Sequence, residues 1–284
     1  MKILASRPGT IYWRLEDADG NLTNSTGSVT VSVSRQRDGL AVATGAVSNP
    51  AAGKYQATIA APGSAPELLN ATWTAPVAGG TVIEPVPVYV VNSRLVALNV
   101  LRHDDELDSL EDWDILRTAL EAAEDECVDN IGYPPIPIMT HNGIQSGGRR
   151  LICPDPWPRT VVAATRPNLT PLTSAELALL QLQEGAVIWQ DNRNWDEGTW
   201  DVYLIHGRWD APPWDLARAL LIRTRYLARR LNNRDDMPER ATSVATEGGT
   251  MTLAFPTLPR PTGLPDVDIV YMRYALASQL PVKV

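Results

Sequence analysis

Hydrophobic and polar residues alternate in short segments along the first third of the chain. Val29–Ser34 is the clearest example, because apolar and hydroxyl side chains take turns along it. A period of two predicts strands with one buried face, and turn signals such as Asp38-Gly39 separate the segments. We therefore predict an immunoglobulin-like β-sandwich over residues 1–91. Its predicted strands cover residues 10–15, 29–34, 54–59, 69–73 and 81–91.

Two later segments repeat apolar residues every three or four positions, which is the period of a helix face. The first helix is predicted from Ser109, a good N-cap, to Ile131, because Gly132 and the prolines after it end it. The second is predicted over about 213–232, since proline is tolerated in the first turn. The first helix is predicted to bury Trp113, Leu116, Leu120, Ala123, Cys127 and Ile131.

Short strands are predicted between these helices, at 149–153, 160–164, 186–189 and 200–205, with a helical turn at 174–179. The strands at 186–189 and 200–205 are predicted to pair with each other around a polar loop, 191–198.

The last part of the chain lacks the apolar content of a compact unit. A hairpin is predicted at 241–255, around Gly248-Gly249, and four prolines from Pro256 to Pro265 favour an extended path. Residues 267–276 are apolar and are predicted to be helical or extended. Such a segment must lie on its own body, on a neighbouring copy or on a partner, because it cannot bury its own apolar side chains.

Together these patterns predict an α+β multidomain protein. It would contain an all-β immunoglobulin-like sandwich (1–91), a mainly α-helical core with β insertions (92–237) and an extended C-terminal arm with a β-hairpin (238–284).

Charge separates the two predicted helices. Residues 103–130 contain twelve acids and one base, Arg117, whereas the polar face of 213–232 is rich in arginine. These faces could lie side by side within one subunit or between neighbours; we predict the contact between neighbours. The residues predicted to make lateral subunit contacts are Asp112, Glu121, Glu124, Asp125, Arg218, Arg225 and Arg229. The formal net charge of -8 argues against polyanion binding by overall charge.

Six of the nine tryptophans fall between Trp157 and Trp214, while the chain has a single phenylalanine. Clustered tryptophans form either a small aromatic core or an interface, and both interpretations stay open at this point. Cys127 and Cys153 are the two cysteines, and nothing in their placement requires an oxidising compartment.

Signatures of catalysis are sparse. The chain has no phosphate-binding glycine loop and no Gly-x-Ser-x-Gly motif, and its three histidines follow no metal-site spacing. His103-Asp104-Asp105 could touch a cation or be a solvated loop. Asp191, Asp196 and Glu197 could be a carboxylate pair for glycoside cleavage or a polar loop tip. We expect no catalytic, metal-binding or cofactor-binding residues, no cofactor and no enzyme activity.

From Glu176 onward, the order of short motifs carries a resemblance. The motifs include Pro212-Pro213-Trp214-Asp215, Arg240-Ala241-Thr242-Ser243 and Pro261-Thr262-Gly263-Leu264-Pro265-Asp266-Val267-Asp268. Over residues 93–284 the chain resembles the head-to-tail adaptor (connector) proteins of long-tailed phages that infect actinobacteria. An immunoglobulin-like module before the adaptor core is similar to a variant of that family.

The resemblance implies a structural virion protein in the neck, made in the host cytoplasm. It implies a homo-oligomeric ring of twelve copies beneath the portal protein, which joins the capsid to the tail and continues the DNA channel. The other expected partners are the portal and the next neck connector or stopper protein. DNA would pass through the lumen without specific binding, and no membrane contact is expected.

The C-terminal arm is expected to dock on the portal or on a neighbouring subunit. Its expected docking residues are Arg240, Phe255, Val267, Ile269, Val270, Tyr271, Met272, Tyr274 and Leu276. Two other functions remain open from the sequence. One is a glycan-binding protein that uses the immunoglobulin-like module and the Trp-rich region, and the other is a hydrolase that uses the carboxylates of 191–197.

Overall fold

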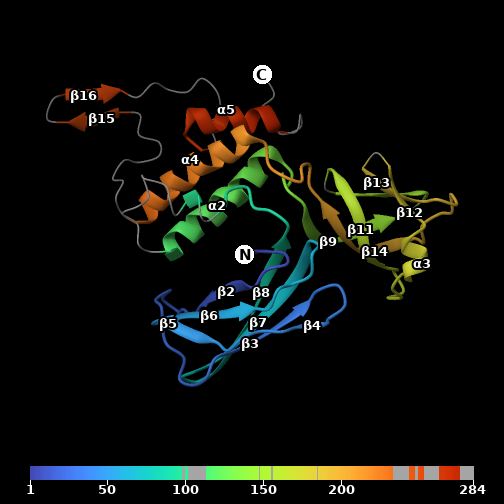
Figure 1. The fold of residues 1–284 in the computed structure, drawn as a ribbon, viewed down its shortest axis with the longest axis horizontal. Coiled ribbons are helices and arrows are strands. Elements are labelled where there is room, and N and C mark those ends of the chain that lie inside the picture. The colour runs from blue at the N-terminus through green and yellow to red at the C-terminus, as the bar shows by residue number, and fades with distance from the viewer. Residues whose placement is uncertain are drawn as a thin grey trace. The chain divides into compact units, whose positions relative to one another are not determined.

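The protein is seen here in a computed structural model, which divides into two compact units (Figure 1). Residues 1–93 and 136–210 form the first unit, and residues 94–135 and 211–284 form the second. The structure describes residues 1–97, 100–101, 113–146, 148–154, 156–183, 185–232, 243–246, 249–252 and 262–275.

The first part of unit one, which we call the N-terminal sandwich, consists of two facing sheets. Five strands form one sheet in the order β1-β8-β7-β3-β4, and three form the other in the order β2-β6-β5. The β1 strand runs parallel to β8, and the other pairs are antiparallel. The strands are β1 (Lys2–Leu4), β2 (Gly9–Arg14), β3 (Thr30–Arg35), β4 (Ala41–Val42), β5 (Ser48–Ala51), β6 (Lys54–Ile59), β7 (Glu67–Val77) and β8 (Gly80–Val91).

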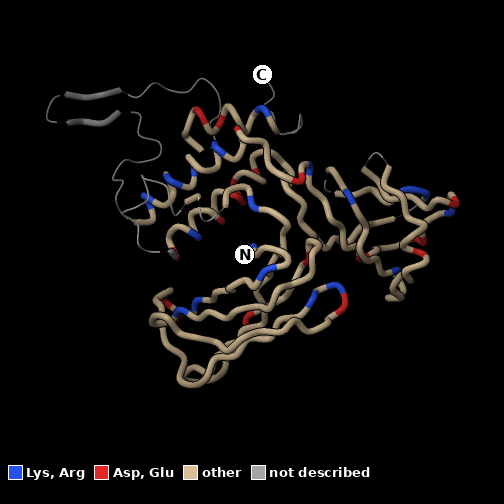
Figure 2. The backbone as a smooth tube through the Cα atoms, in the orientation of Figure 1, with Lys and Arg blue, Asp and Glu red and all other residues tan. Residues whose placement is uncertain are grey.

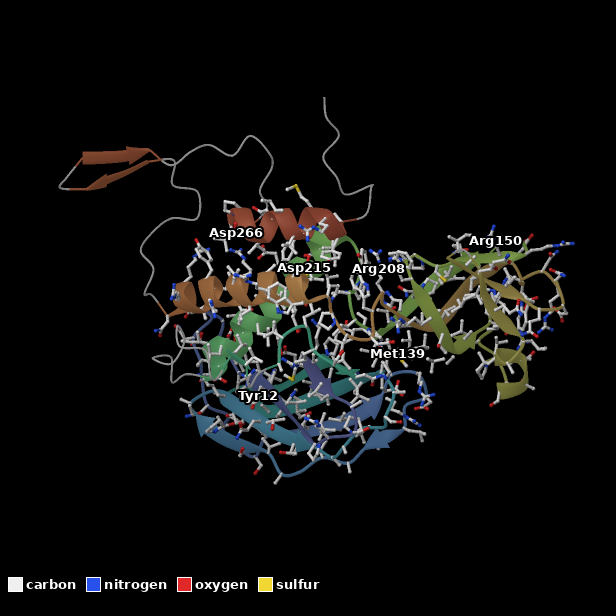
Figure 3. The ribbon with its side chains drawn as sticks, turned by 45° about the horizontal axis from the view of Figure 1, so that its top comes forward. Tyr12, Met139, Arg150, Arg208, Asp215 and Asp266 are labelled. Atoms are coloured by element: carbon white, nitrogen blue, oxygen red, sulfur yellow. The ribbon has the colours of Figure 1, made fainter. Side chains whose placement is uncertain are left out.

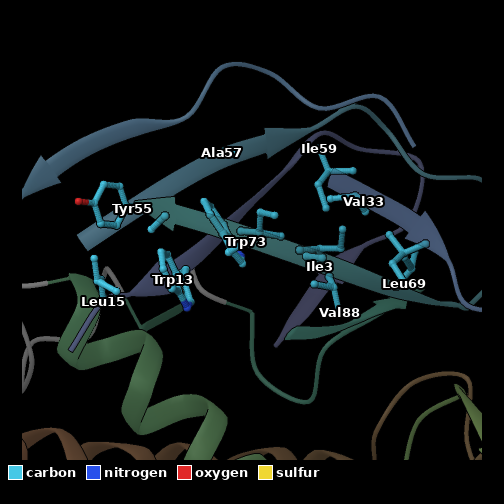
Figure 4. Packing of buried hydrophobic residues seen from close by; sticks show 14 residues of the cluster. Ile3, Trp13, Leu15, Val33, Tyr55, Ala57, Ile59, Leu69, Trp73 and Val88 are labelled. Atoms are coloured by element: carbon cyan, nitrogen blue, oxygen red, sulfur yellow. The ribbon is translucent and has the colours of Figure 1, made fainter. Parts of the chain in front are cut away.

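This arrangement confirms the predicted sandwich over residues 1–91. The orders β2-β6-β5 and β8-β7-β3 correspond to strands B-E-D and G-F-C of an immunoglobulin-type sandwich. The strands β2, β6 and β7 bury alternate residues, and side chains from both sheets form one core (Figure 4). Trp13 stacks on Trp73 at 5.7 Å between ring centroids. The Tyr55 ring lies at the same distance from Trp13, with its plane tilted by 36°. These aromatic rings supply much of the buried area of the sandwich.

The rest of unit one, residues 136–210, is a second β structure that we call the Trp-rich module. It has two three-stranded sheets, β10-β13-β12 and β11-β14-β9. Its elements are β9 (Ile138–Ser146), β10 (Arg150–Ile152), β11 (Pro158–Thr165), α3 (Ser174–Leu177), β12 (Leu180–Gln183), β13 (Ala186–Trp189) and β14 (Gly198–His206).

The predicted pairing of 186–189 with 200–205 is wrong. The β13 strand pairs with β10 and β12, whereas β14 pairs with β9 and β11 in the other sheet. The strand β9 is not predicted from the sequence, because Asn142-Gly143 has the composition of a turn. In the structure these two residues lie in mid-strand, opposite Val202 and Asp201.

Three of the clustered tryptophans form the core of the Trp-rich module. Trp189, Trp195 and Trp200 are each no more than 3% exposed. The Trp195 ring lies 4.9 Å from Trp189 and meets Trp200 edge-on at 4.8 Å. The core interpretation is therefore confirmed for these three, and Trp157 (45% exposed) and Trp214 (73% exposed) lie on the surface.

The Trp-rich module packs with the N-terminal sandwich. Leu68 of β7, Met139 of β9 and Tyr203 of β14 form one buried cluster, and the Tyr203 hydroxyl donates to the Gln36 carbonyl at 3.1 Å. The predicted core over 92–237 is corrected accordingly. Its strands belong to unit one and its two long helices to unit two, because apolar strand residues join the two β structures.

Unit two, which we call the helical unit, contains α2 (Trp113–Ile131), α4 (Trp214–Leu231) and α5 (Pro265–Tyr274). Its described residues also include a hairpin of β15 (Ser243–Thr246) and β16 (Gly249–Thr252), within the predicted 241–255. No helix in the described part of the chain is both long and apolar enough to cross a bilayer.

The structure confirms the two long helices. The α2 helix ends at Ile131, and Gly132 follows with a φ of 83°, as a helix C-terminus favours. Its predicted apolar face is buried at Leu116, Leu120, Ala123, Cys127 and Ile131, whereas the predicted start at Ser109 lies outside the described residues. The α4 helix buries Leu216, Leu220 and Ala228, and Leu231 at its end is half exposed.

The segment 238–284 is not an extended arm throughout. Residues 265–274 form α5, and its Val267 and Tyr271 are buried in the helical unit. Pro265 begins this helix instead of preventing it, because its missing N–H is not needed in a first turn.

Gly53, between β5 and β6, tests the packing of the sandwich. Its φ is +68°, and a Cβ there would lie 2.9 Å from the Leu22 Cβ and 2.9 Å from the Thr23 nitrogen. Gly20 also has a positive φ, +81°, but nothing lies within 4 Å of its Cβ position. We expect Gly20→Ala to cost about 1 kcal/mol of unfolding free energy from backbone strain. Gly53→Ala should cost about 1–3 kcal/mol more from overpacking. Urea unfolding followed by tryptophan fluorescence measures both, and equal losses would contradict the predicted clash.

Candidate interaction site in the helical unit

The side chain of Arg223 lies at the centre of the helical unit. It sits on the arginine-rich α4 helix, yet it is only 5% exposed. Its ε and η2 nitrogens both lie 2.9 Å from Oε2 of Glu126 on α2, and its η1 nitrogen donates to the Thr262 carbonyl at 3.2 Å. The Arg223 guanidinium therefore joins α4 to α2 and to the segment that precedes α5. Its planar set of five N–H donors allows it to bind several acceptors at once.

Thr262 also closes the start of α5. Its backbone nitrogen donates to Asp268 Oδ1 at 3.1 Å and its hydroxyl to the same oxygen at 2.7 Å. The Leu264 nitrogen donates back to the Thr262 hydroxyl at 3.1 Å, while Gly263 supplies a φ of +74°. Thr262 and Asp268 are both buried. Residues 262–268 thus form a turn followed by the first turn of α5, held together by hydrogen bonds within the segment.

Asp215 joins the beginning of α4 to the end of α5 (Figure 3). The Tyr274 hydroxyl donates to its Oδ1 at 2.6 Å, and Arg273 Nη1 lies 2.7 Å from its Oδ2. The bond from Tyr274 lowers the pKa of Asp215, with help from the Leu216 N–H and Arg273, against an opposing effect of burial. Tyr133 just beyond α2 donates to the Tyr274 carbonyl at 2.9 Å, so the end of α5 is fixed on two sides.

Tyr271 of α5 is buried beside Cys127 of α2. It is 1% exposed, and burial, followed by the proximity of Cys127 and Glu126, raises the pKa of its hydroxyl well above the usual range. It therefore stays neutral at physiological pH and acts as packing for α5.

These contacts revise the expected docking residues. Val267 (0% exposed) and Tyr271 are enclosed within their own unit, so these two are not available to a partner. Ile269 is 54% exposed, and Val270, Met272 and Tyr274 are half-buried. Arg240, Phe255 and Leu276 lie outside the described residues.

The expected lateral contacts are revised in a similar way. Glu124 is fully buried and cannot reach another subunit. Of the others, Asp125, Arg218 and Arg229 are exposed, Glu121 and Arg225 are half-buried, and Asp112 lies outside the described residues. The Arg223–Glu126 pair shows that the basic and acidic helices meet within one chain, while a contact between neighbours stays a prediction. Figure 2 shows the basic positions along α4.

The other candidate chemistry is not assembled into a site. Asp191, Asp196 and Glu197 are exposed on the connection between β13 and β14, which crosses between sheets and is no hairpin tip. His103-Asp104-Asp105 lies outside the described residues. No cluster of three or more His, Cys, Asp or Glu that could hold a metal ion occurs among the described residues. Trp189, Trp195 and Trp200 are too buried and too far from coplanar to stack on a sugar.

Removal of the Arg223 side chain should destabilise the helical unit. Arg223→Met removes the guanidinium from Glu126, and we expect a loss of about 3 kcal/mol. Arg223→Met combined with Glu126→Met should lose less than the sum of the two single losses, because both members of the ion pair are removed together. Hydrogen exchange of α2, α4 and α5 measures the effect, and Arg218→Met on the exposed face of α4 is the control. A double variant that loses the sum of the single losses would contradict the predicted coupling.

Asp215 should make the contact between α4 and α5 sensitive to acid. Because its pKa is lowered in the folded state, its contribution is complete above the unfolded value of 3.8 and is lost as pH falls through the folded pKa. Asp215→Asn should therefore be less stable than wild type at pH 7, and the difference should shrink below about pH 4. Urea unfolding at several pH values measures this. Asp266→Asn, exposed at the start of α5 (Figure 3), is the control.

Comparisons with known proteins give distant likenesses. No protein-family model matches the chain, and no curated protein matches it either. A chain in the neck of the native GTA particle, computed with C12 symmetry, is 17% identical over 63% of this chain and 90% of that chain, with a TM-score of 0.40. One in the neck of the empty GTA particle, computed with C6 symmetry, is 18% identical over 63% and 86%, also at 0.40.

The filamin domain of Lin-41 is 19% identical over 32% of this chain and 84% of that domain, with a TM-score of 0.25. All three TM-scores lie below 0.5, so these likenesses carry no argument about function.

Proposed function

We propose that this chain is a non-catalytic structural protein of a phage-like particle, a head-to-tail adaptor that assembles as a ring in the neck. The ring would lie beneath the portal protein, be built from about twelve copies as the sequence resemblance implies, and lead DNA toward the tail. The next connector or stopper protein would bind to its far side.

The observation that carries this proposal is the convergence of the resemblance motifs. Pro212-Pro213-Trp214-Asp215 and the segment from Pro261 to Asp268 are far apart in the sequence. The structure bonds both into the helical unit, the first through Asp215 and α5, the second through Thr262 and Arg223. These two motifs of the resemblance therefore belong to one framework, the helical unit.

The charge distribution fits a DNA channel. Strong contacts with phosphates would hold DNA in place, and the chain has a formal net charge of -8. The most deeply placed arginine of the basic helix, Arg223, is occupied by Glu126 and Thr262 within the subunit.

The N-terminal sandwich and the Trp-rich module would belong to the same rigid part of each subunit. Their shared cluster of Leu68, Met139 and Tyr203 supports this arrangement. The sandwich alone is then not expected to be a detachable decoration, and removal of residues 1–91 should expose the apolar side chains of Met139 and Tyr203.

The proposal is tested on the particles of the source virus. Antibodies against this chain should label one site per particle, where the head joins the tail, in negative-stain images. Deletion of the gene should leave DNA-filled heads and separate tails, and a plasmid copy should restore joined particles. Joined, infectious particles without the protein would refute the proposal, as would labelling confined to the capsid faces or the tail tip.

A further inference from the structure

The start of α4 carries an exposed aromatic and cationic patch. Trp214, the first residue of the helix, is 73% exposed, and the guanidinium of Arg218, one turn later, lies 5.4 Å from its ring. Burying a tryptophan removes a large apolar area from water, and Trp and Arg are the residues most enriched at the energetic centres of protein interfaces. We call Trp214 and Arg218 the α4 patch.

The α4 patch is held on a rigid framework. Asp215, between its two members in sequence, is bonded to Arg273 and Tyr274 of α5. The Arg273 side chain is itself 61% exposed, so the patch has a positive border. An anchor whose backbone is already fixed loses little conformational freedom on binding.

The outer face of α2 offers the complementary surface. Thr118, Ala122, Asp125 and Asp129 are all exposed, and their spacing of four, three and four residues places them on one stripe of the helix. Two small side chains at one end leave room for a large ring, and two acids at the other end match the charge of Arg218. We call these four residues the α2 stripe.

We propose that the α4 patch of one copy docks on the α2 stripe of a second copy of this chain. Because patch and stripe are different surfaces, each subunit binds one neighbour by its patch and another by its stripe, which generates a ring or an open chain. This inference rests on the proposed ring function and names the contact between its subunits. It differs from the pair Arg223–Glu126, which is internal to one copy.

Self-association of the full chain tests the contact. Sedimentation velocity over a concentration series should show a wild-type chain that associates, and Trp214→Ala should weaken association at least about 30-fold, as expected for an interface anchor. Ala122→Arg should weaken it similarly, by filling the space for the ring. Leu231→Ala, at an exposed apolar residue on the far end of α4, is the matched control and should not change association.

A charge exchange identifies the partner surface. Arg218→Glu and Asp129→Arg should each weaken association, and the variant with both changes should regain most of it, because the exchanged charges meet between copies. Failure of the double variant to recover, or normal association by Trp214→Ala, overturns the inference. So does a wild-type chain that stays monomeric at every concentration, or a Trp214→Ala defect confined to binding another protein.

Failure of the inference and failure of the proposed function are distinguishable. If Trp214→Ala still enters the neck of joined particles, the contact is wrong while the adaptor role stands. If the gene is dispensable for joined particles, the adaptor role is wrong, and the sedimentation results still decide whether the α4 patch binds the α2 stripe.

Discussion

A single buried cation determines how the helical unit is organised. Removing a guanidinium from water is costly unless its donors are used, and Arg223 uses them on Glu126 and on the Thr262 carbonyl. Because these partners lie on α2 and just before α5, the helices cannot be placed independently of one another. The hydrogen bonds of Thr262 hold the start of α5, and the bond from Tyr274 to Asp215 holds its end. Both sets of bonds depend on how α2, α4 and α5 are placed relative to one another.

Much of the secondary structure follows from local pattern. The strands β6 and β7 of the sandwich alternate buried and more exposed residues, and the face of α2 is regular enough to predict which residues are buried. The pairing between strands is harder to predict from the sequence, because it depends on partners that are distant in the sequence. The turn-like composition of Asn142-Gly143 hid β9, and β14 was predicted to pair with β13, the strand that precedes it in the sequence.

The central contacts of the candidate site could not be predicted from the local sequence pattern. Arg223 belongs to a helix with many arginines, and nothing in its immediate neighbours marks it as the buried one. Asp268 lies six residues after Thr262, whereas the familiar capping box has a spacing of three. The proline at position 265 is a usable signal for a helix start, but the four prolines spread from Pro256 to Pro265 favour an extended path. The sequence shows Trp214 as part of a motif, but it does not show that this tryptophan is exposed while the core tryptophans are buried.

The bond between Thr262 and Arg223 also constrains where the β15–β16 hairpin can go. The chain leaves α4 after Leu231 and is bonded back to Arg223 of that same helix at Thr262. The β15–β16 hairpin lies between these two points in the sequence, so the chain on both sides of it leads back to the same subunit. Any surface on the hairpin therefore stays near its own subunit, at an effective concentration set by the length of the connecting chain.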